Sequence, residues 1–226
     1  RFLREARTIA TLNHPHIVQI YDAVVAEDLC YIVVEYVAGG TLEAHAHPGS
    51  LLPVDRVVEL IFKCTRALDY AYRLGITHRD IKPANILLSG PSDVKISDFG
   101  AAIIKHASVE RTQISGIGSP AYMSPQQVQE QSLDHRTDIY SLGVVMHQLL
   151  TGELPFAAHN SYSMVYQIVN GEAARPSAQR PGLPPVLDEI VGRATARELD
   201  ARYPTWAAFA HDLAQAVRNH QLKTPR

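Results

Sequence analysis

Apolar residues recur at helical spacing along most of the chain. Residues 1–12 show this period, and the prolyl residue of the 13–15 segment ends it, because proline disfavours helix in the residue before it. Residues 54–74 place their apolar side chains on one face and predict a long amphipathic helix. Residues 141–150 are strongly apolar, too uniformly so for a surface helix, which predicts a buried central helix. Further helices are predicted over residues 161–170, 186–196 and 204–217.

Strand patterns occupy other parts of the chain. Residues 17–25 and 30–37 are rich in β-branched and aromatic side chains, and the short polar break between them predicts an antiparallel pair. Two shorter β-like segments lie at 86–88 and 94–96. Together these patterns predict an α+β protein with a small β-containing piece followed by a larger helical one.

Composition narrows the class of protein. The 226 residues are 46% hydrophobic, enough for one sizeable core, and 21 basic against 23 acidic residues give a net charge of −2. No charge run indicates a nucleic-acid or membrane-surface partner. No apolar run approaches the roughly 20 residues of a membrane span. The eleven histidines are scattered, and His45 and His47 are interpreted as solvated polar residues.

Cys30 and Cys64 lie in apolar stretches and are interpreted as buried free thiols, which fits a reducing, cytoplasmic location. The chain has no initiator methionine and begins inside a helical pattern, which indicates a fragment.

The chemistry concentrates in two segments. His78-Arg79-Asp80-Ile81-Lys82-Pro83-Ala84-Asn85 is followed 13 residues after its last member by Asp98-Phe99-Gly100. Phosphoryl transfer needs a metal to neutralise the polyphosphate and a carboxylate to orient the attacking hydroxyl. Asn85 and Asp98 can supply the oxygen ligands that Mg²⁺ prefers. Asp80 remains free to accept a proton, with Lys82 beside it.

This joint pattern resembles the catalytic loop and metal motif of protein kinases. The resemblance implies ATP and Mg²⁺ as cofactors, Asp80 as catalytic base, Lys82 at the γ-phosphate, and Asn85 and Asp98 as metal ligands. Lys82 and the 118–123 segment resemble the Ser/Thr-specific class, with Ser119 in place of the usual threonine. The phrases HPHIVQIYD, THRDIKPANILL and AYMSP are most similar to bacterial Ser/Thr kinases.

The resemblance extends to the nucleotide site. Glu5 matches the helix glutamate that pairs with the catalytic lysine. The backbone of Glu35 and Val37 is expected to bond adenine, with Val34 as gatekeeper, and Leu87 matches the residue beneath the adenine ring. These roles come from the alignment alone.

Other matches concern support and regulation. Asp138 matches a buried aspartate that holds the catalytic-loop backbone, and Ile9, Ile20, His78 and Phe99 match an apolar column between the lobes. Arg79 implies activation by a phosphate on the following loop, with Ser108, Thr112 and Ser115 as candidate acceptors and Thr112 and Ser115 favoured.

The sequence also departs from the family. The Gly-rich loop and the lysine-bearing strand are absent ahead of Glu5, so this chain by itself is expected to have little activity. Gln126 stands where the family has a glutamate that pairs with an arginine, here Arg202, and we expect a weaker brace. The implied fold is the two-lobed kinase fold, with an incomplete β-rich N-lobe over residues 1–37 and a complete α-rich C-lobe over residues 38–226.

The implied partners are proteins with Ser/Thr acceptors, and the resemblance allows a homodimer for activation-loop phosphorylation. Bacterial relatives often continue into a membrane span, so a longer native protein would be tethered to the membrane. Two alternatives stay open. One is a non-catalytic pseudokinase scaffold, which would not need Asp80, Lys82, Asn85 and Asp98. The other is a small-molecule phosphotransferase of the aminoglycoside or choline type, which generally lacks the His-Arg-Asp form and Lys82.

Overall fold

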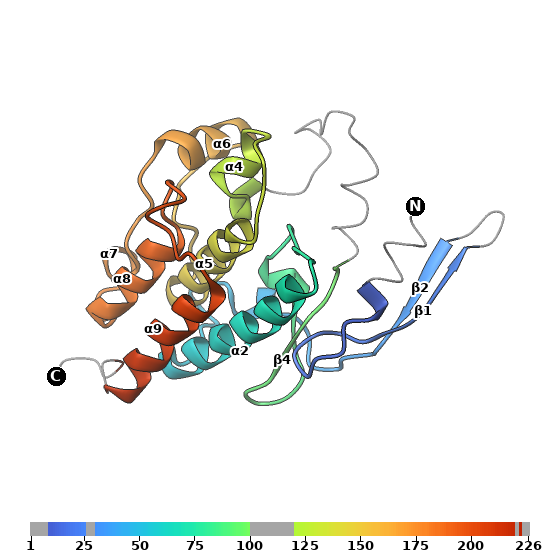
Figure 1. Ribbon diagram of the computed structural model, residues 1–226. Coiled ribbons are helices and arrows are strands. Elements are labelled where there is room, and N and C mark those ends of the chain that lie inside the picture. The colour runs from blue at the N-terminus through green and yellow to red at the C-terminus, as the bar shows by residue number, and fades with distance from the viewer. Residues whose placement is uncertain (1–8, 26–29, 100–119, 220–221, 223–226) are drawn as a thin grey trace.

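The protein is α+β, as predicted. The computed structural model describes residues 9–25, 30–99, 120–219 and 222. A two-stranded sheet stands at one side of the molecule, and the helices gather at the other (Figure 1). The division at residue 37 stays a prediction. Most of the predicted 1–12 helix lies outside the described residues, and helical backbone is described at residues 9 and 10.

The first sheet pairs β1 (Ile20–Val25) with β2 (Cys30–Val34) in antiparallel register, with Val24 opposite Tyr31. Both strands are shorter than predicted. The segment before β1 bonds elsewhere: the amide of Val18 donates to the carbonyl of Ile96 at 2.9 Å. This bond ties the first sheet to the second.

The second sheet pairs β3 (Ile86–Leu88) with β4 (Val94–Ile96) in antiparallel register. Both strands match the predicted β-like segments, whose pairing the sequence did not predict. Its first strand follows η2 (Pro83–Asn85), and Thr41, just before η1 (Leu42–His45), bridges to Leu87. Gly39 allows this approach, since a Cβ there would lie 2.0 Å from the carbonyl oxygen of Leu88.

Two long helices form the core. α2 (Val54–Arg73) is amphipathic, as predicted, and packs its buried face against α5 (Arg136–Thr151) and α9 (Trp206–Arg218). α5 is buried almost all round, and it begins five residues earlier than predicted. Its first turn carries polar residues that are themselves buried, Thr137 and Asp138, so hydropathy did not reveal its start.

Small residues let α5 meet α8 (Pro185–Ala194) closely. A Cβ at Gly143 would lie 2.7 Å from the Cβ of Ala194, so a larger residue there would push the helices apart. Gly152 ends α5 with a φ of 81°, a conformation that glycine adopts without strain.

The remaining helices surround these. α6 (Ser161–Asn170) matches its predicted bounds and begins with a capping box at Asn160. Single turns show no periodicity, so η1 and η2 were not predicted, and neither were η4 (Pro120–Tyr122), α4 (Pro125–Val128) and α7 (Pro176–Gln179). A second apolar cluster joins η4 to α6 through Ala121, Phe156, Met164 and Ile168.

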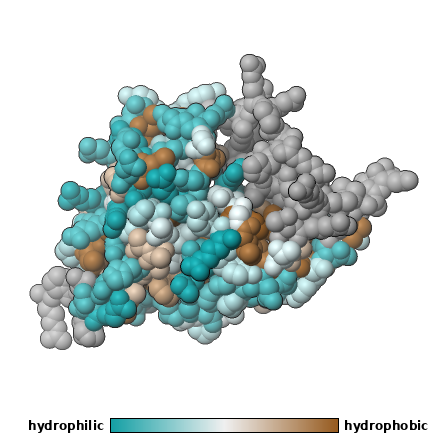
Figure 2. Space-filling view, viewed as in Figure 1, coloured by the Kyte–Doolittle hydropathy of each residue, from teal (hydrophilic) through white to brown (hydrophobic). Residues whose placement is uncertain are grey.

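The surface is mixed. On the face in Figure 2, polar residues predominate and apolar residues form small separate groups. Within the described residues, no helix has the length and apolar character needed to cross a bilayer.

Candidate active site

The loop that carries Asp80 is held from below by one buried carboxylate. Asp138, at the start of α5, accepts the backbone N–H of His78 and that of Arg79, each at 2.7 Å. Burial raises the pKa of Asp138 above its ordinary value, against the lowering effect of His78 and of the two amide donors. The predicted anchoring role of Asp138 is therefore confirmed in its geometry.

Two residues of the candidate site have a strained backbone conformation. Arg79 has a φ of 65° and Asp98 a φ of 59°, in the left-handed region that side chains disfavour. Such residues cost about 1–3 kcal/mol each and persist only where surrounding contacts fix them. Arg79 directly precedes Asp80, and Asp98 is the first residue of the predicted metal motif.

Two predicted residues, Lys82 and Asn85, contact the Asp80 carboxylate. The ammonium of Lys82 lies 3.0 Å from the Asp80 carboxylate, and the side-chain amide of Asn85 donates to the same oxygen at 3.1 Å. That amide also donates to the Asp80 carbonyl at 2.8 Å. The side chains of Lys82 and Asp80 are 37% and 32% exposed, so a substrate hydroxyl can reach them.

Asp98 is connected to this group through Ser97. The Ser97 hydroxyl donates to the Asp98 carboxylate at 3.2 Å and also lies 3.3 Å from the Asn85 carbonyl. The donor set fits Mg²⁺: Asn85 uses its amide nitrogen toward Asp80, and its side-chain oxygen has no described protein partner. Asp98 adds carboxylate oxygen, and hard oxygen ligands suit this ion. No cluster of three or more His, Cys, Asp or Glu side chains suited to a metal occurs in the described part of the chain.

His78 supports the loop and leaves the chemistry to Asp80. Its Nδ1 accepts the amide of Asp80 at 3.2 Å, which leaves Nε2–H to donate to the Ser97 carbonyl at 2.8 Å. Its ring meets Phe99 edge to face, with centroids 4.6 Å apart. Ile9 and Phe99 belong to one large buried cluster, against which Ile20 packs. Their stacking in a column stays a prediction.

Two of the predicted nucleotide residues, Glu35 and Val37, follow the end of β2, and a third, Leu87, lies on β3. The Glu35 amide donates to the Gln19 carbonyl at 2.8 Å, and its carboxylate lies 2.9 Å from the Lys95 ammonium. Burial opposes ionisation there, but Lys95 and the Gln19 amide outweigh it and lower the pKa of Glu35. Leu87 is half-buried between two buried neighbours on β3 and so faces away from the core. No described protein group bonds to the Val37 amide.

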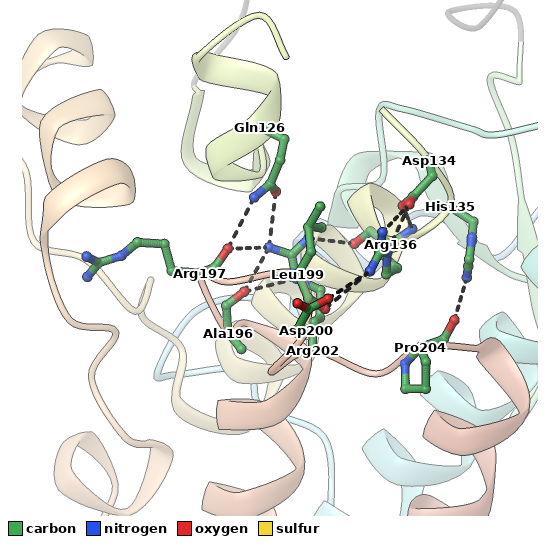
Figure 3. Close-up of polar contacts among 10 residues, drawn as sticks. All are labelled: Gln126, Asp134, His135, Arg136, Ala196, Arg197, Leu199, Asp200, Arg202 and Pro204. Atoms are coloured by element: carbon green, nitrogen blue, oxygen red, sulfur yellow. Dashed lines mark hydrogen bonds and ion pairs between the residues drawn. The ribbon is translucent and has the colours of Figure 1, made fainter. Parts of the chain in front are cut away.

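The predicted contact between Gln126 and Arg202 is present (Figure 3). Arg202 donates to the Gln126 side-chain oxygen at 3.1 Å, and the Gln126 amide donates to the Arg197 carbonyl at 3.1 Å. This brace joins α4 to the segment before α9.

Several residues with predicted roles lie outside the part of the chain that the structure describes. Glu5, Ser108, Thr112, Ser115 and Ser119 belong to this group. Two residues that the sequence did not single out prove central: Ser97, which links Asn85, His78 and Asp98, and Gln127. The Ser124–Gln127 spacing fits a capping box and could have drawn attention to Gln127.

A cavity of about 590 Å³ lies elsewhere, between α5, α6 and α8, lined in part by Tyr140, Phe156 and Ile168. None of the residues around Asp80 lines this cavity.

The chain is similar to known proteins along its length. The protein kinase domain family matches residues 1–211. The chain is 40% identical over 230 residues to serine/threonine-protein kinase PknB of Mycobacterium leprae, covering 100% of this chain and 36% of the relative. The corresponding values for PknB of Mycobacterium tuberculosis H37Rv are 40% over 232 residues, 100% and 37%. A probable PknB of Bifidobacterium longum is 39% identical over 224 residues, covering 94% of this chain and 32% of the relative. The chain thus spans just over a third of the length of its mycobacterial relatives.

Proposed function

Because this chain belongs to the protein kinase family, we propose that its protein transfers the γ-phosphoryl group of ATP to Ser or Thr hydroxyls of other proteins. The observation that carries the proposal is the grouping of Lys82 and Asn85 on the Asp80 carboxylate. The mycobacterial relatives are named as Ser/Thr kinases, which supports the same acceptor class.

Each of these residues has a distinct part in the proposed reaction. Asp80 accepts the proton of the attacking hydroxyl and orients its oxygen. Lys82, already bonded to Asp80, offsets negative charge on the transferring group. Asn85 and Asp98 would hold Mg²⁺, which neutralises phosphate charge when bound. Asn85 also fixes the Asp80 carboxylate through its amide, so one side chain serves both orientation and metal binding.

The adenine would lie against the end of β2 and Leu87. The carbonyl of Glu35 and the amide of Val37 make no described protein bond and are free to pair with a base. The Glu35 carboxylate is engaged with Lys95 and with the Gln19 N–H. Glu5 would pair with a lysine that holds the α- and β-phosphates.

Arg79 supports a proposal about regulation. Its Nε is buried and has no hydrogen-bond partner among the described residues. A buried cationic donor without a partner is costly, and a phosphate supplies the acceptors that it lacks. We therefore retain Ser108, Thr112 and Ser115 as candidate phosphoacceptors, with transfer between two copies of the protein as one route. A cytoplasmic location follows from the need for ATP and agrees with the buried free thiol of Cys64.

The test is transfer of labelled phosphate from ATP to a generic basic protein, with the protein expressed from its complete open reading frame. We expect label on phosphoserine and phosphothreonine, lost when Mg²⁺ is chelated. Label on an aminoglycoside or choline instead would favour the small-molecule class. Absence of all transfer would favour a scaffold and overturn the proposal.

A further inference from the structure

Arg79, the strained residue before Asp80, is held by hydrogen bonds at both its N–H and its carbonyl. The N–H of Arg79 bonds to Asp138, as described above, and its carbonyl accepts the side-chain amide of Gln127 at 3.0 Å. Gln127 lies on α4, 48 residues further along the chain. Both peptide groups of Arg79 are therefore held, one from α5 and the other from α4.

The Gln127 amide is oriented by its other bonds. Its side-chain oxygen accepts the Ser124 N–H at 2.9 Å, and its own N–H donates to the Ser124 hydroxyl at 3.3 Å, which closes a capping box. Because the oxygen is committed to Ser124, the NH₂ group must face Arg79. The Ser124 hydroxyl in turn lies 3.3 Å from that of Thr137 on α5.

These contacts point to a mechanical role. A left-handed Arg79 relaxes unless it is over-determined, and relaxation there would rotate Asp80. The Asp138 bonds hold only the amide side of Arg79. The next peptide, which joins Arg79 to Asp80, is held at its N–H by Nδ1 of His78 at 3.2 Å and at its carbonyl by Gln127.

We propose that Gln127 is a positioning residue for phosphoryl transfer, which fixes the peptide between Arg79 and Asp80 and couples α4 to the direction of the Asp80 carboxylate. The inference rests on the proposed function for its kinetic consequence. Gln127 would act through the backbone of Arg79.

Substitutions can separate the bond from Gln127 to the Arg79 carbonyl from the capping box of Ser124 and Gln127. Gln127→Glu keeps the oxygen that accepts the Ser124 N–H, and glutamate is a usual partner in a capping box. It removes the donor to Arg79 and places a carboxylate oxygen against the carbonyl. Ser124→Ala does the reverse, since it removes the hydroxyl cap and leaves the Gln127 amide able to reach Arg79. Gln129→Glu makes the same chemical change next to α4, on an exposed residue whose side-chain oxygen only accepts from Gln131.

The experiment compares wild type and the three variants by kcat, KM for ATP, thermal unfolding and hydrogen exchange of residues 78–80. For Gln127→Glu we expect kcat to fall about tenfold, with KM changed less than about twofold and exchange faster. Ser124→Ala should unfold at a lower temperature and keep its kcat, and Gln129→Glu should match wild type.

Two outcomes overturn the inference. One is an active wild type with unchanged kcat and exchange in Gln127→Glu. The other is a fall in kcat of Gln127→Glu that is fully explained by a smaller fraction of folded protein, as a purely structural role would give. An inactive wild type would count against the proposed function instead, and the exchange rates would still decide whether Gln127 holds the loop.

Discussion

Arg202 donates a hydrogen bond of 3.1 Å to the neutral side-chain oxygen of Gln126. Arg202 is 1% exposed, and its remaining donors reach carbonyl oxygens of Arg136, Ala196 and Arg197. Its guanidinium therefore has no carboxylate within ion-pair distance in the described part of the chain. Burial accordingly lowers the pKa of Arg202 to about 10.

Gln126→Glu should stabilise the protein. A carboxylate at this position would keep the bond to Arg202 and add an opposite charge beside a buried cation. The lost donor to the Arg197 carbonyl costs little, because Arg202 also bonds that oxygen. We expect a net gain of about 1 kcal/mol, or roughly 2–4 °C in the unfolding temperature.

Gln126→Leu is the matched control for that substitution. It removes both side-chain bonds at similar volume, and we expect a loss of about 1–3 kcal/mol. A Gln126→Glu variant that unfolds at or below the wild-type temperature would show that the neutral brace is already the stronger one.

Asp138→Asn should damage both stability and catalysis. Asparagine offers one acceptor in place of two, and its NH₂ would face the N–H of His78 or Arg79. The expected loss in the free energy of unfolding is about 2–3 kcal/mol. We also expect a lower kcat for the molecules that remain folded. Chemical denaturation and initial rates measure the two effects.

Asp69→Asn serves as the control for Asp138→Asn, since Asp69 pairs with the largely exposed Arg73 on the surface of α2. Its cost should stay below about 1 kcal/mol. Equal losses in the two variants would contradict the anchoring role of Asp138.

The proximity of the candidate residues around Asp80 could be predicted from the sequence, because they are close along the chain. Asp80, Lys82 and Asn85 fall within six positions, and η2 brings them together locally. The link to Asp98 could also be predicted, since β3 and β4 form a short hairpin whose ends must return to one place.

The supporting contacts were harder to predict. The bond from Gln127 to Arg79 spans 48 residues and depends on how α4 docks, which no local pattern encodes. The early start of α5 was missed for a related reason: Thr137 and Asp138 are polar, yet tertiary hydrogen bonds make their burial favourable.

Stability should depend on pH through Glu35. Its pKa is lowered in the folded state, so the ionised form contributes stability that is complete above about pH 5 and is lost as pH falls through the lowered pKa. Glu35→Gln keeps an acceptor for the Gln19 N–H and removes the charge facing Lys95. Urea midpoints should differ at pH 7 and converge near about pH 3. A constant difference across this range would rule out the ion pair as the cause.

Lys82→Met should lower kcat with little effect on folding. The Lys82 and Asp80 side chains are about one-third exposed, so their ion pair contributes at most about 1 kcal/mol to stability. Its removal leaves charge on the transferring group without an offset, and we expect kcat to fall by at least about tenfold. A large drop in the unfolding temperature with normal kcat would assign Lys82 a structural role.

The most direct test of the central claim is phosphate transfer by Asp80→Asn. Asparagine preserves the shape of the side chain and an acceptor for Asn85, but it cannot take a proton from a substrate hydroxyl. We predict a fall in transfer to protein Ser and Thr of about 100-fold or more at an unchanged unfolding temperature. Equal transfer by Asp80→Asn and wild type would contradict the assignment of Asp80 as the base, and with it the proposed reaction at this site.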